Sequence, residues 1–109
     1  MYLKIKNRKI KLYEYKSFIE KVKSFRFYLK EINYAIKLPN KKIANTYFFC
    51  QKIDICFTNK NDEIIYLYKN VSSEKIIIKI KAKNIYYLPL KTTENLKIGE
   101  KLNIIEDKK

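Results

Sequence analysis

Apolar and polar residues alternate along most of the chain, which is the pattern of β-strands that bury one face. Near the N-terminus a lysine separates Leu3 from Ile5, and Ile10 and Leu12 repeat this spacing after a polar break. Two short alternating runs joined by a polar pair of residues predict a β-hairpin.

The pattern changes to a helical period from Ser17 onward. The apolar residues that recur there at intervals of three and four are Phe18, Val22, Phe25 and Leu29. Ser17 is a suitable N-cap, and Glu20 stands three residues later, as in a capping box. Because this spacing places the apolar side chains on one side of a helix, we predict an amphipathic helix that begins at Ser17 and ends between Ser24 and Tyr28.

The remainder of the chain returns to strand patterns. Candidate strands cover residues 34–38, 46–50, 53–58, 63–68, 76–80, 84–88 and 102–105, and Thr92 or Thr93 starts a helical turn that stops at Gly99. Residues 46–50 are apolar on both faces and predict a central strand, whereas residues 59–62 predict a tight turn. The predicted fold class is α+β, mainly β: a small antiparallel, barrel-like sheet of seven or eight short strands with one amphipathic helix. It forms a single β-rich domain over residues 1–105, with a frayed tail at 106–109.

Four residue types dominate the composition, with 23 Lys, 18 Ile, 10 Asn and 10 Tyr among 109 residues, and the net charge is +14. With no His and one Gly, the chain lacks the imidazole of the common catalytic sets and the glycines of phosphate-binding loops. The positive charge suits a nucleic-acid binder. The four abundant types all have A/T-rich codons, however, and Arg, which phosphate contacts favour, occurs only twice. We therefore interpret the charge mainly as the product of an AT-rich genome, with selected nucleic-acid binding as the alternative.

The two cysteines, Cys50 and Cys56, lie in apolar surroundings. In a reducing cytosol such thiols are usually buried as small hydrophobic residues, and a disulfide between them is the alternative. Because no further Cys or His stands at metal-ligand spacing, we expect no metal and no cofactor. The apolar runs are only a few residues long, and the N-terminus has no unbroken apolar stretch. We therefore expect a cytoplasmic protein with no membrane insertion.

From the predicted helix onward, the order of motifs resembles the small bacterial family known as domain of unknown function 192. The Phe-rich segment of that family corresponds to residues 44–49, and its next strand and turn correspond to residues 52–57 and 59–63. Its Leu-Pro pair is matched by residues 88–89, and its closing Gly-containing segment is matched by residues 96–102. The resemblance implies that the chain shares the fold of this family.

The chain departs from the family pattern at several positions within the matched region, residues 12–104. Asn45 stands where family members tend to have His, Ser24 replaces a Gly, and Lys52 replaces a Pro. Leu90 and Lys91 stand in place of an Ala-Gly pair, so the resemblance implies a divergent member. Since the family has no established function, the resemblance implies a fold and no particular activity.

Asp54 is the most distinctive candidate for a binding site, because it is a carboxylate within an apolar strand. Together with Asn45 and Thr46 it forms the predicted ligand-binding set. The alternative is structural, since a half-buried Asp commonly accepts hydrogen bonds from a nearby turn or helix N-terminus. We predict no catalytic residue.

A second set of candidates concerns nucleic acid and consists of Lys52, Tyr66, Tyr68, Tyr86 and Tyr87. Basic residues beside exposed aromatic rings allow small barrels to stack on the bases and neutralise the backbone of a single strand. We expect at least one ring of each tyrosine pair to face outward. The alternative is that outward Tyr and Lys shield the sheet surface and protect its edges.

These patterns favour a non-enzymatic, cytoplasmic binding or interaction domain whose partner is an unidentified ligand or protein. The first alternative is a single-stranded nucleic-acid-binding barrel that uses Lys and Tyr. A further alternative is a divergent hydrolase-like enzyme with a site around Asn45, Thr46 and Asp54.

Overall fold

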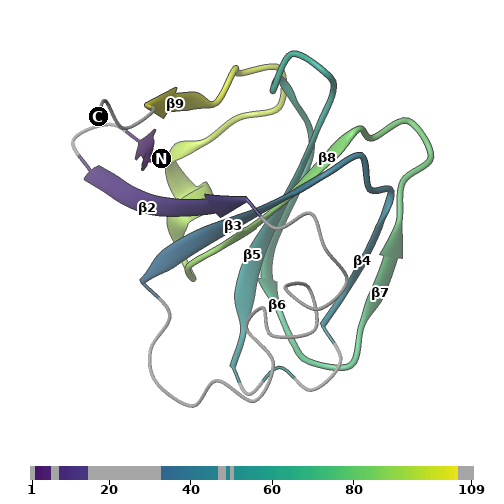
Figure 1. Ribbon diagram of the computed structural model, residues 1–109. Coiled ribbons are helices and arrows are strands. Elements are labelled where there is room, and N and C mark those ends of the chain that lie inside the picture. Colours follow the sequence, from purple (N-terminus) through teal and green to yellow (C-terminus); the bar gives the residue numbers. More distant parts are fainter. Residues whose placement is uncertain (1, 6–7, 15–32, 47–48, 50, 106–109) are drawn as a thin grey trace.

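The computed structural model describes residues 2–5, 8–14, 33–46, 49 and 51–105, which form nine strands and one short 3-10 helix (Figure 1). The strands are β1 (Tyr2–Ile5), β2 (Arg8–Glu14), β3 (Tyr34–Pro39), β4 (Ile43–Asn45), β5 (Ile53–Thr58), β6 (Ile64–Val71), β7 (Ile76–Ile78), β8 (Asn84–Leu88) and β9 (Asn103–Ile105). Seven of them form one curled sheet, and β4 and β7 form a separate two-stranded sheet beside it. The prediction of a mainly β, barrel-like fold is confirmed.

The large sheet has the strand order β6-β5-β8-β3-β2-β1-β9. All neighbours pair antiparallel except β2 and β3, which are parallel, so the prediction of a purely antiparallel sheet is wrong. The reason is the longest connection between consecutive strands, which runs from Glu14 to Tyr34. Parallel neighbours require a long crossover, and this connection supplies one.

Two of the predicted segments fall outside the described residues, namely the amphipathic helix from Ser17 and the frayed tail at 106–109. Within the described residues there is no α-helix, and the 3-10 helix η1 (Thr92–Asn95) confirms the predicted helical turn. The described part of the chain also contains no helix with the length and apolar character needed to cross a membrane.

The predicted N-terminal hairpin is present as β1 and β2, and the predicted tight turn at residues 59–62 joins β5 and β6. In the turn between β5 and β6, the side-chain oxygen of Asn59 accepts hydrogen bonds from the backbone N–H of Asn61 (2.9 Å) and of Glu63 (3.0 Å). Asp62 has a φ of 60°, in the left-handed region that Asp tolerates better than most residues. The Asn-Lys-Asn-Asp sequence therefore stabilises its own turn through local hydrogen bonds and backbone conformation.

The large sheet is apolar on both faces and carries two separate cores. The first core consists of Ile36, Leu38, Ala44, Phe49, Ile53, Ile55, Phe57, Ala82, Ile85 and Tyr87. The second core consists of Leu3, Ile5, Ile10, Leu12, Ala35, Cys56, Ile64, Tyr86, Leu88, Leu96 and Leu102. Every residue of the central strands β5 and β8 is buried, because each strand contributes alternate side chains to the two cores.

The two edges of the large sheet are joined near the start of β6. The backbone N–H of Ile64 donates to Glu100 O (2.8 Å), and the N–H of Gly99 donates to Ile64 O (2.7 Å). The N–H of Leu102 donates to Asp62 O (2.9 Å), and Glu63 forms a bridge with the neighbouring Lys101. Because β9 pairs in turn with β1, this seam curls the sheet toward a barrel.

In the small sheet, the isoleucines that alternation alone would place in a core are exposed. Ile76 and Ile78 are 53% and 57% exposed, whereas Ile77 between them packs against the first core. The predicted central strand at residues 46–50 is described only in part, and the strand in this region is β4, which ends at Asn45. The strands that are buried on both faces are β5 and β8 instead.

Candidate functional site

Asp54 lies on β5 and turns away from the first core, in which its neighbours Ile53 and Ile55 are packed. It is 1% exposed. Its Oδ2 accepts hydrogen bonds from the backbone N–H of Thr93 (2.9 Å) and from the Thr93 hydroxyl (2.8 Å), and its Oδ1 accepts one from the N–H of Asn70 (2.9 Å). A buried carboxylate needs such donors, and here they come from the end of β6 and from η1. Asp54 therefore ties two distant segments together.

A pocket of about 260 Å³ lies where these segments meet. Its lining residues are Asp54, Lys69, Asn70, Leu90, Lys91 and Glu94. Two of them are in the left-handed region, Asn70 with a φ of 60° and Lys91 with a φ of 70°. Strained backbone of this kind concentrates at sites of binding and is kept in place by the surrounding structure. In this pocket the Asp54 hydrogen bonds hold one of the two strained residues directly.

The rim of the pocket, rather than its floor, carries the groups that are accessible to a ligand. Asp54 is covered and its oxygens already accept three hydrogen bonds, whereas Lys69, Lys91 and Glu94 are exposed. Two ammonium groups can donate to an anionic or carbonyl group, and the Glu94 carboxylate can accept from an amine or hydroxyl. The rim is therefore complementary to a small polar ligand that carries both kinds of group.

Asn45 and Thr46, the other two residues of the predicted ligand set, lie apart from this pocket. The Thr46 hydroxyl donates to Ser72 O (2.8 Å) and accepts from the N–H of Lys75 (2.9 Å). The Asn45 backbone exchanges hydrogen bonds with the hydroxyl of Tyr87, at 3.2 Å and 3.1 Å. Tyr87 belongs to the first core, on the opposite face of the sheet from the Asp54 side chain, and only Asp54 of the three lines the pocket. The structure thus does not assemble the three residues into one site.

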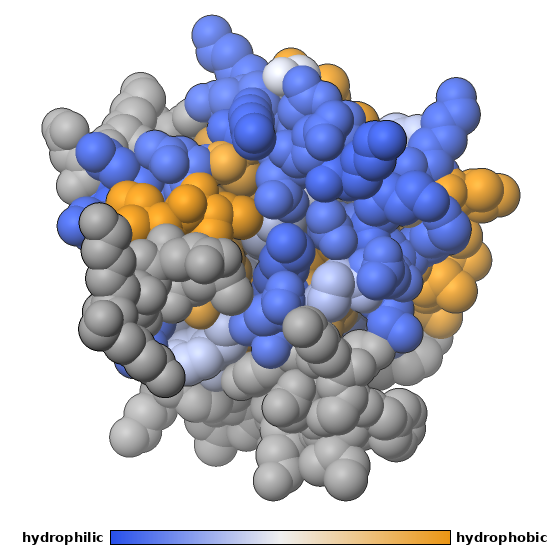
Figure 2. Space-filling model, turned by 45° about the horizontal axis from the view of Figure 1, so that its top comes forward, coloured by the Kyte–Doolittle hydropathy of each residue, from blue (hydrophilic) through white to orange (hydrophobic). Residues whose placement is uncertain are grey.

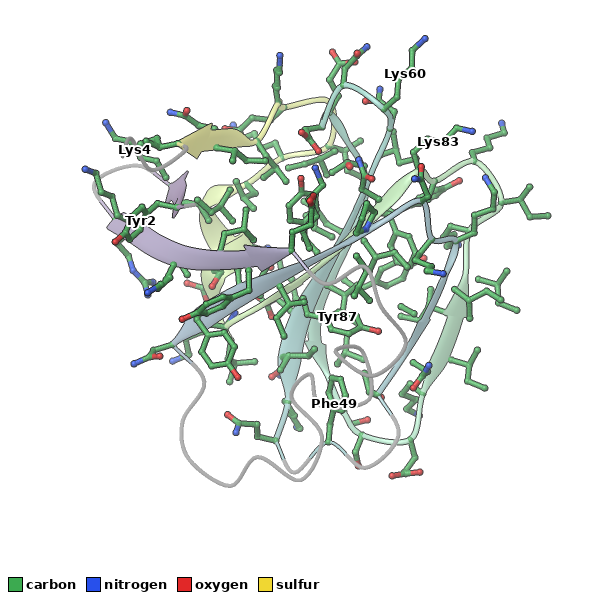
Figure 3. All side chains as sticks on the ribbon, viewed as in Figure 1. Tyr2, Lys4, Phe49, Lys60, Lys83 and Tyr87 are labelled. Atoms are coloured by element: carbon green, nitrogen blue, oxygen red, sulfur yellow. The ribbon has the colours of Figure 1, made fainter. Side chains whose placement is uncertain are left out.

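The predicted nucleic-acid residues are split between the surface and the interior. Tyr86 and Tyr87 are 0% and 1% exposed, so the expectation that one of these rings faces outward is wrong. The physical reason is the central position of β8, where both faces of the strand are covered. Tyr87 packs edge-on against Phe49, with ring centroids 5.6 Å apart (Figure 3). Lys52 is exposed, and its side chain remains available at the surface.

Tyr66 and Tyr68 are half-buried, and their rings contact Phe57 edge-on. The Nζ of Lys79 lies 4.7 Å from the centroid of Tyr66 and 5.6 Å from that of Tyr68. A cation over both rings is a favourable contact in itself. A stacked base would therefore have to displace Lys79.

A second polar cluster, around Asp62, lies beyond the other end of β5 and was not predicted. The Tyr86 hydroxyl donates to Asp62 Oδ1 (2.5 Å), and the Asn84 side-chain amide donates to the same oxygen (3.4 Å). The Nζ of Lys37 is 3.7 Å from Asp62 Oδ1. Thr58 faces Asn84 across the strand pair and is fully buried, and its hydroxyl has no hydrogen-bond partner within the described residues.

Two acidic groups beside the Asp62 cluster have raised pKa values, chiefly because they are buried. Burial raises the pKa of Tyr86 well above its ordinary value, and the hydrogen bond to Asp62 and the negative charges of Asp62 and Glu14 act in the same direction. Burial, and to a lesser extent the Asp62 charge, raises the pKa of Cys56, which is a buried free thiol. Cys56 is therefore a neutral part of the second core, whereas Cys50 lies outside the described residues.

Sequence reasoning identified Asp54 but missed the pocket rim. Lys69 and Glu94 are ordinary surface residues in the sequence, and they meet only because the end of β6 reaches the loop that follows β8. The signal that existed was Asn70, since Asn at the end of a strand often adopts a positive φ. Among the described residues, no group of three or more His, Cys, Asp or Glu is placed to hold a metal ion.

No protein-family model matches the chain, and no curated protein matches it in sequence. Two solved structures share its fold. One, from Sinorhizobium meliloti 1021, is described as a "putative transcription regulator"; it has a TM-score of 0.77 and 10% identity, over 94% of this chain and 89% of that one. The other is a protein of unknown function from Novosphingobium aromaticivorans DSM 12444, with a TM-score of 0.76 and 10% identity, over 94% of this chain and 82% of that one. At this identity the likeness shows the fold alone.

Proposed function

We propose that this chain is a non-enzymatic, cytoplasmic binding domain and a divergent member of domain of unknown function 192. Its ligand site is the pocket over Asp54, and its ligand is a small polar molecule that carries both an anionic and a hydrogen-bond-donating group. The observation that carries this proposal is the mixed rim of Lys69, Lys91 and Glu94 on a frame that Asp54 fixes by three hydrogen bonds. Asp54 acts as a positioning residue, and the exposed rim makes the contacts.

The proposal is tested by a thermal-shift screen with α-amino acids and sugar phosphates, which carry the two kinds of group. We expect at least one compound to raise the melting temperature of the wild type. Lys69→Ala and Glu94→Gln should each weaken its binding by about tenfold, the equivalent of one charge-assisted hydrogen bond. Lys60→Ala is the matched control, because Lys60 is exposed on the turn beyond the other end of β5 (Figure 3). If the hits bind both rim variants as well as the wild type, the pocket is not the site.

Single-stranded nucleic acid is the second candidate ligand. The observation that favours it is the pair of half-buried rings, Tyr66 and Tyr68, on which a base could stack in place of Lys79. The test is the fluorescence anisotropy of a labelled oligonucleotide at moderate salt. A stacking site predicts that Tyr66→Ala and Tyr68→Ala each weaken binding by about tenfold. Binding that disappears with salt and does not respond to either tyrosine would indicate only a general attraction to a basic protein.

A further inference from the structure

The outer face of the small sheet and the turn after β7 expose four isoleucines, which we call the isoleucine patch: Ile43, Ile76, Ile78 and Ile80. Ile43 and Ile78 face each other across the β4–β7 pair, and they are 54% and 57% exposed. Ile80, in the turn after β7, is 78% exposed. In Figure 2 hydrophobic side chains gather along the right-hand edge, the side on which β7 lies in Figure 1. Contiguous exposed apolar surface of this kind marks an interaction site.

Lysines surround this patch in the sequence and in the structure. The segments that form it, residues 40–45 and 74–83, contain six lysines and a single acidic residue, Glu74. Lys75 and Lys81 are exposed, and the Nζ of Lys42 donates to the backbone of Ile80 (2.7 Å). A second copy of the chain would bring like charges together around the patch. An anionic partner is therefore favoured over self-association.

The chemistry of the patch favours a lipid surface over a folded protein. Protein interfaces derive most of their affinity from aromatic and Arg anchors, and the isoleucine patch contains neither. An apolar surface bordered by lysines is typical of proteins that bind an anionic bilayer. In such complexes the aliphatic side chains enter the boundary of the acyl chains, and the lysines contact the lipid headgroups. The paired register of Ile43 and Ile78 places these two exposed side chains side by side on the small sheet.

We propose that the isoleucine patch and its lysines form a docking surface for an anionic lipid bilayer, on which the domain adsorbs without spanning it. This surface is independent of the pocket over Asp54. The two sites lie on different parts of the fold, since the patch belongs to β4 and β7 and the pocket to the loops around β5, β6 and η1. A ligand in the pocket and a bilayer at the patch can therefore be tested separately.

The test is co-sedimentation of the full chain with vesicles of phosphatidylcholine alone and of phosphatidylcholine mixed with phosphatidylglycerol. We expect binding to the mixed vesicles only. The double variant Ile76→Ser/Ile78→Ser should bind them at least about tenfold more weakly, because it removes two inserted side chains. Lys75→Glu/Lys81→Glu should have at least as large an effect, because each lysine removed costs about fivefold in affinity. Circular dichroism verifies that each variant is folded.

Two controls separate this surface from a general effect of charge. Lys4→Glu/Lys97→Glu changes the net charge by the same amount at exposed positions elsewhere (Figure 3), and Ile98→Ser removes an isoleucine that is 66% exposed outside the patch. Both should retain nearly wild-type binding. Equal losses in the patch and control variants would overturn the proposal. So would an absence of vesicle binding, or a dimer in sedimentation velocity that Ile76→Ser/Ile78→Ser abolishes.

Discussion

Two carboxylates, Asp54 and Asp62, lie at opposite ends of β5, and the protein holds them in different ways. Asp54 is almost fully buried and accepts two of its three hydrogen bonds from backbone N–H groups. The Asp62 side chain is 22% exposed and is contacted by the side chains of Tyr86, Asn84 and Lys37. Water cannot readily replace the buried Asp54 carboxylate as an acceptor, whereas it can enter beside the partly exposed Asp62. Asp54 is thus a structural requirement for the loops around the pocket, and Asp62 is an adjustable element of a polar cluster.

The largest predicted effect comes from removing each carboxylate in turn. Asp54→Ala leaves the buried N–H of Thr93 and the part-buried N–H of Asn70 without an acceptor, and should lower the free energy of unfolding by about 3 kcal/mol. Asp62→Ala should cost only about 1 kcal/mol, because Asp62 is partly exposed and water can take the place of its carboxylate as the acceptor. Urea unfolding of both variants beside the wild type measures the difference. Equal losses would remove the distinction between the two ends of β5.

The same substitution at two threonines should have opposite signs. Thr93→Val removes a hydroxyl that donates to Asp54, and it should destabilise the protein by about 1.5 kcal/mol. Thr58→Val removes a buried hydroxyl that has no partner among the described residues, and it should stabilise the protein by about 1 kcal/mol. The urea unfolding midpoints show whether each variant is stabilised or destabilised, provided that the dependence of the unfolding free energy on urea is unchanged. A destabilised Thr58→Val variant would mean that this hydroxyl is satisfied in solution.

Tyr86→Phe tests the main side-chain partner of Asp62. The variant keeps the buried ring and loses the hydroxyl that donates to the carboxylate, so we expect a loss of about 1 kcal/mol. The control is Tyr66→Phe, a half-buried ring on the first core, which should change stability by less than about 0.5 kcal/mol. A loss for Tyr86→Phe as large as that for Asp54→Ala would contradict the adjustable character of the Asp62 cluster.

The smallest predicted effect is a pH dependence confined to the Asp62 end. The pKa of Tyr86 in the folded protein is raised above the ordinary value of 10.0, so its contribution to stability is intact below pH 10. Above pH 10 the unfolded chain loses this proton while the folded chain keeps it, and stability falls. Between pH 8 and pH 10.5 the wild type should therefore lose somewhat more stability than Tyr86→Phe, by less than about 1 kcal/mol. If the stabilities of the two proteins fall in parallel as the pH rises, the proton of Tyr86 does not contribute to the pH dependence.

Local signals in the sequence were sufficient for the hairpins and insufficient for the small sheet. The β5–β6 hairpin was predictable because alternation and a self-capping turn both lie within a few residues of each other. In residues 75–81 every second residue is an isoleucine, and this pattern is just as clear. Yet Ile76, Ile78 and Ile80 are exposed, and Ile77 packs against the first core. Alternation specifies that two faces differ, and tertiary packing decides which of them is buried.

The candidate site was predictable only where one residue is chemically out of place. Asp54 stood out as a carboxylate in an apolar strand, and its alternative role as an acceptor for loop N–H groups is the one that its hydrogen bonds match. Lys69 and Glu94 are remote in sequence and join the pocket through the packing of two loops. The contact between Asp62 and Tyr86 could not be predicted for the same reason, since these residues are far apart in the sequence and lie on a turn and on a central strand.

Because β9 pairs with β1 and residues 99–102 form the seam, the sheet can close only after these residues have been synthesised. Strand β1 is synthesised before β9, and among the described residues its outer hydrogen-bonding edge is covered by residues 103–105. Until then the nascent chain presents one exposed, apolar sheet edge of the kind that pairs wrongly with other chains. Final closure therefore takes place after synthesis of this region, and a translational arrest before residue 99 would leave an aggregation-prone intermediate.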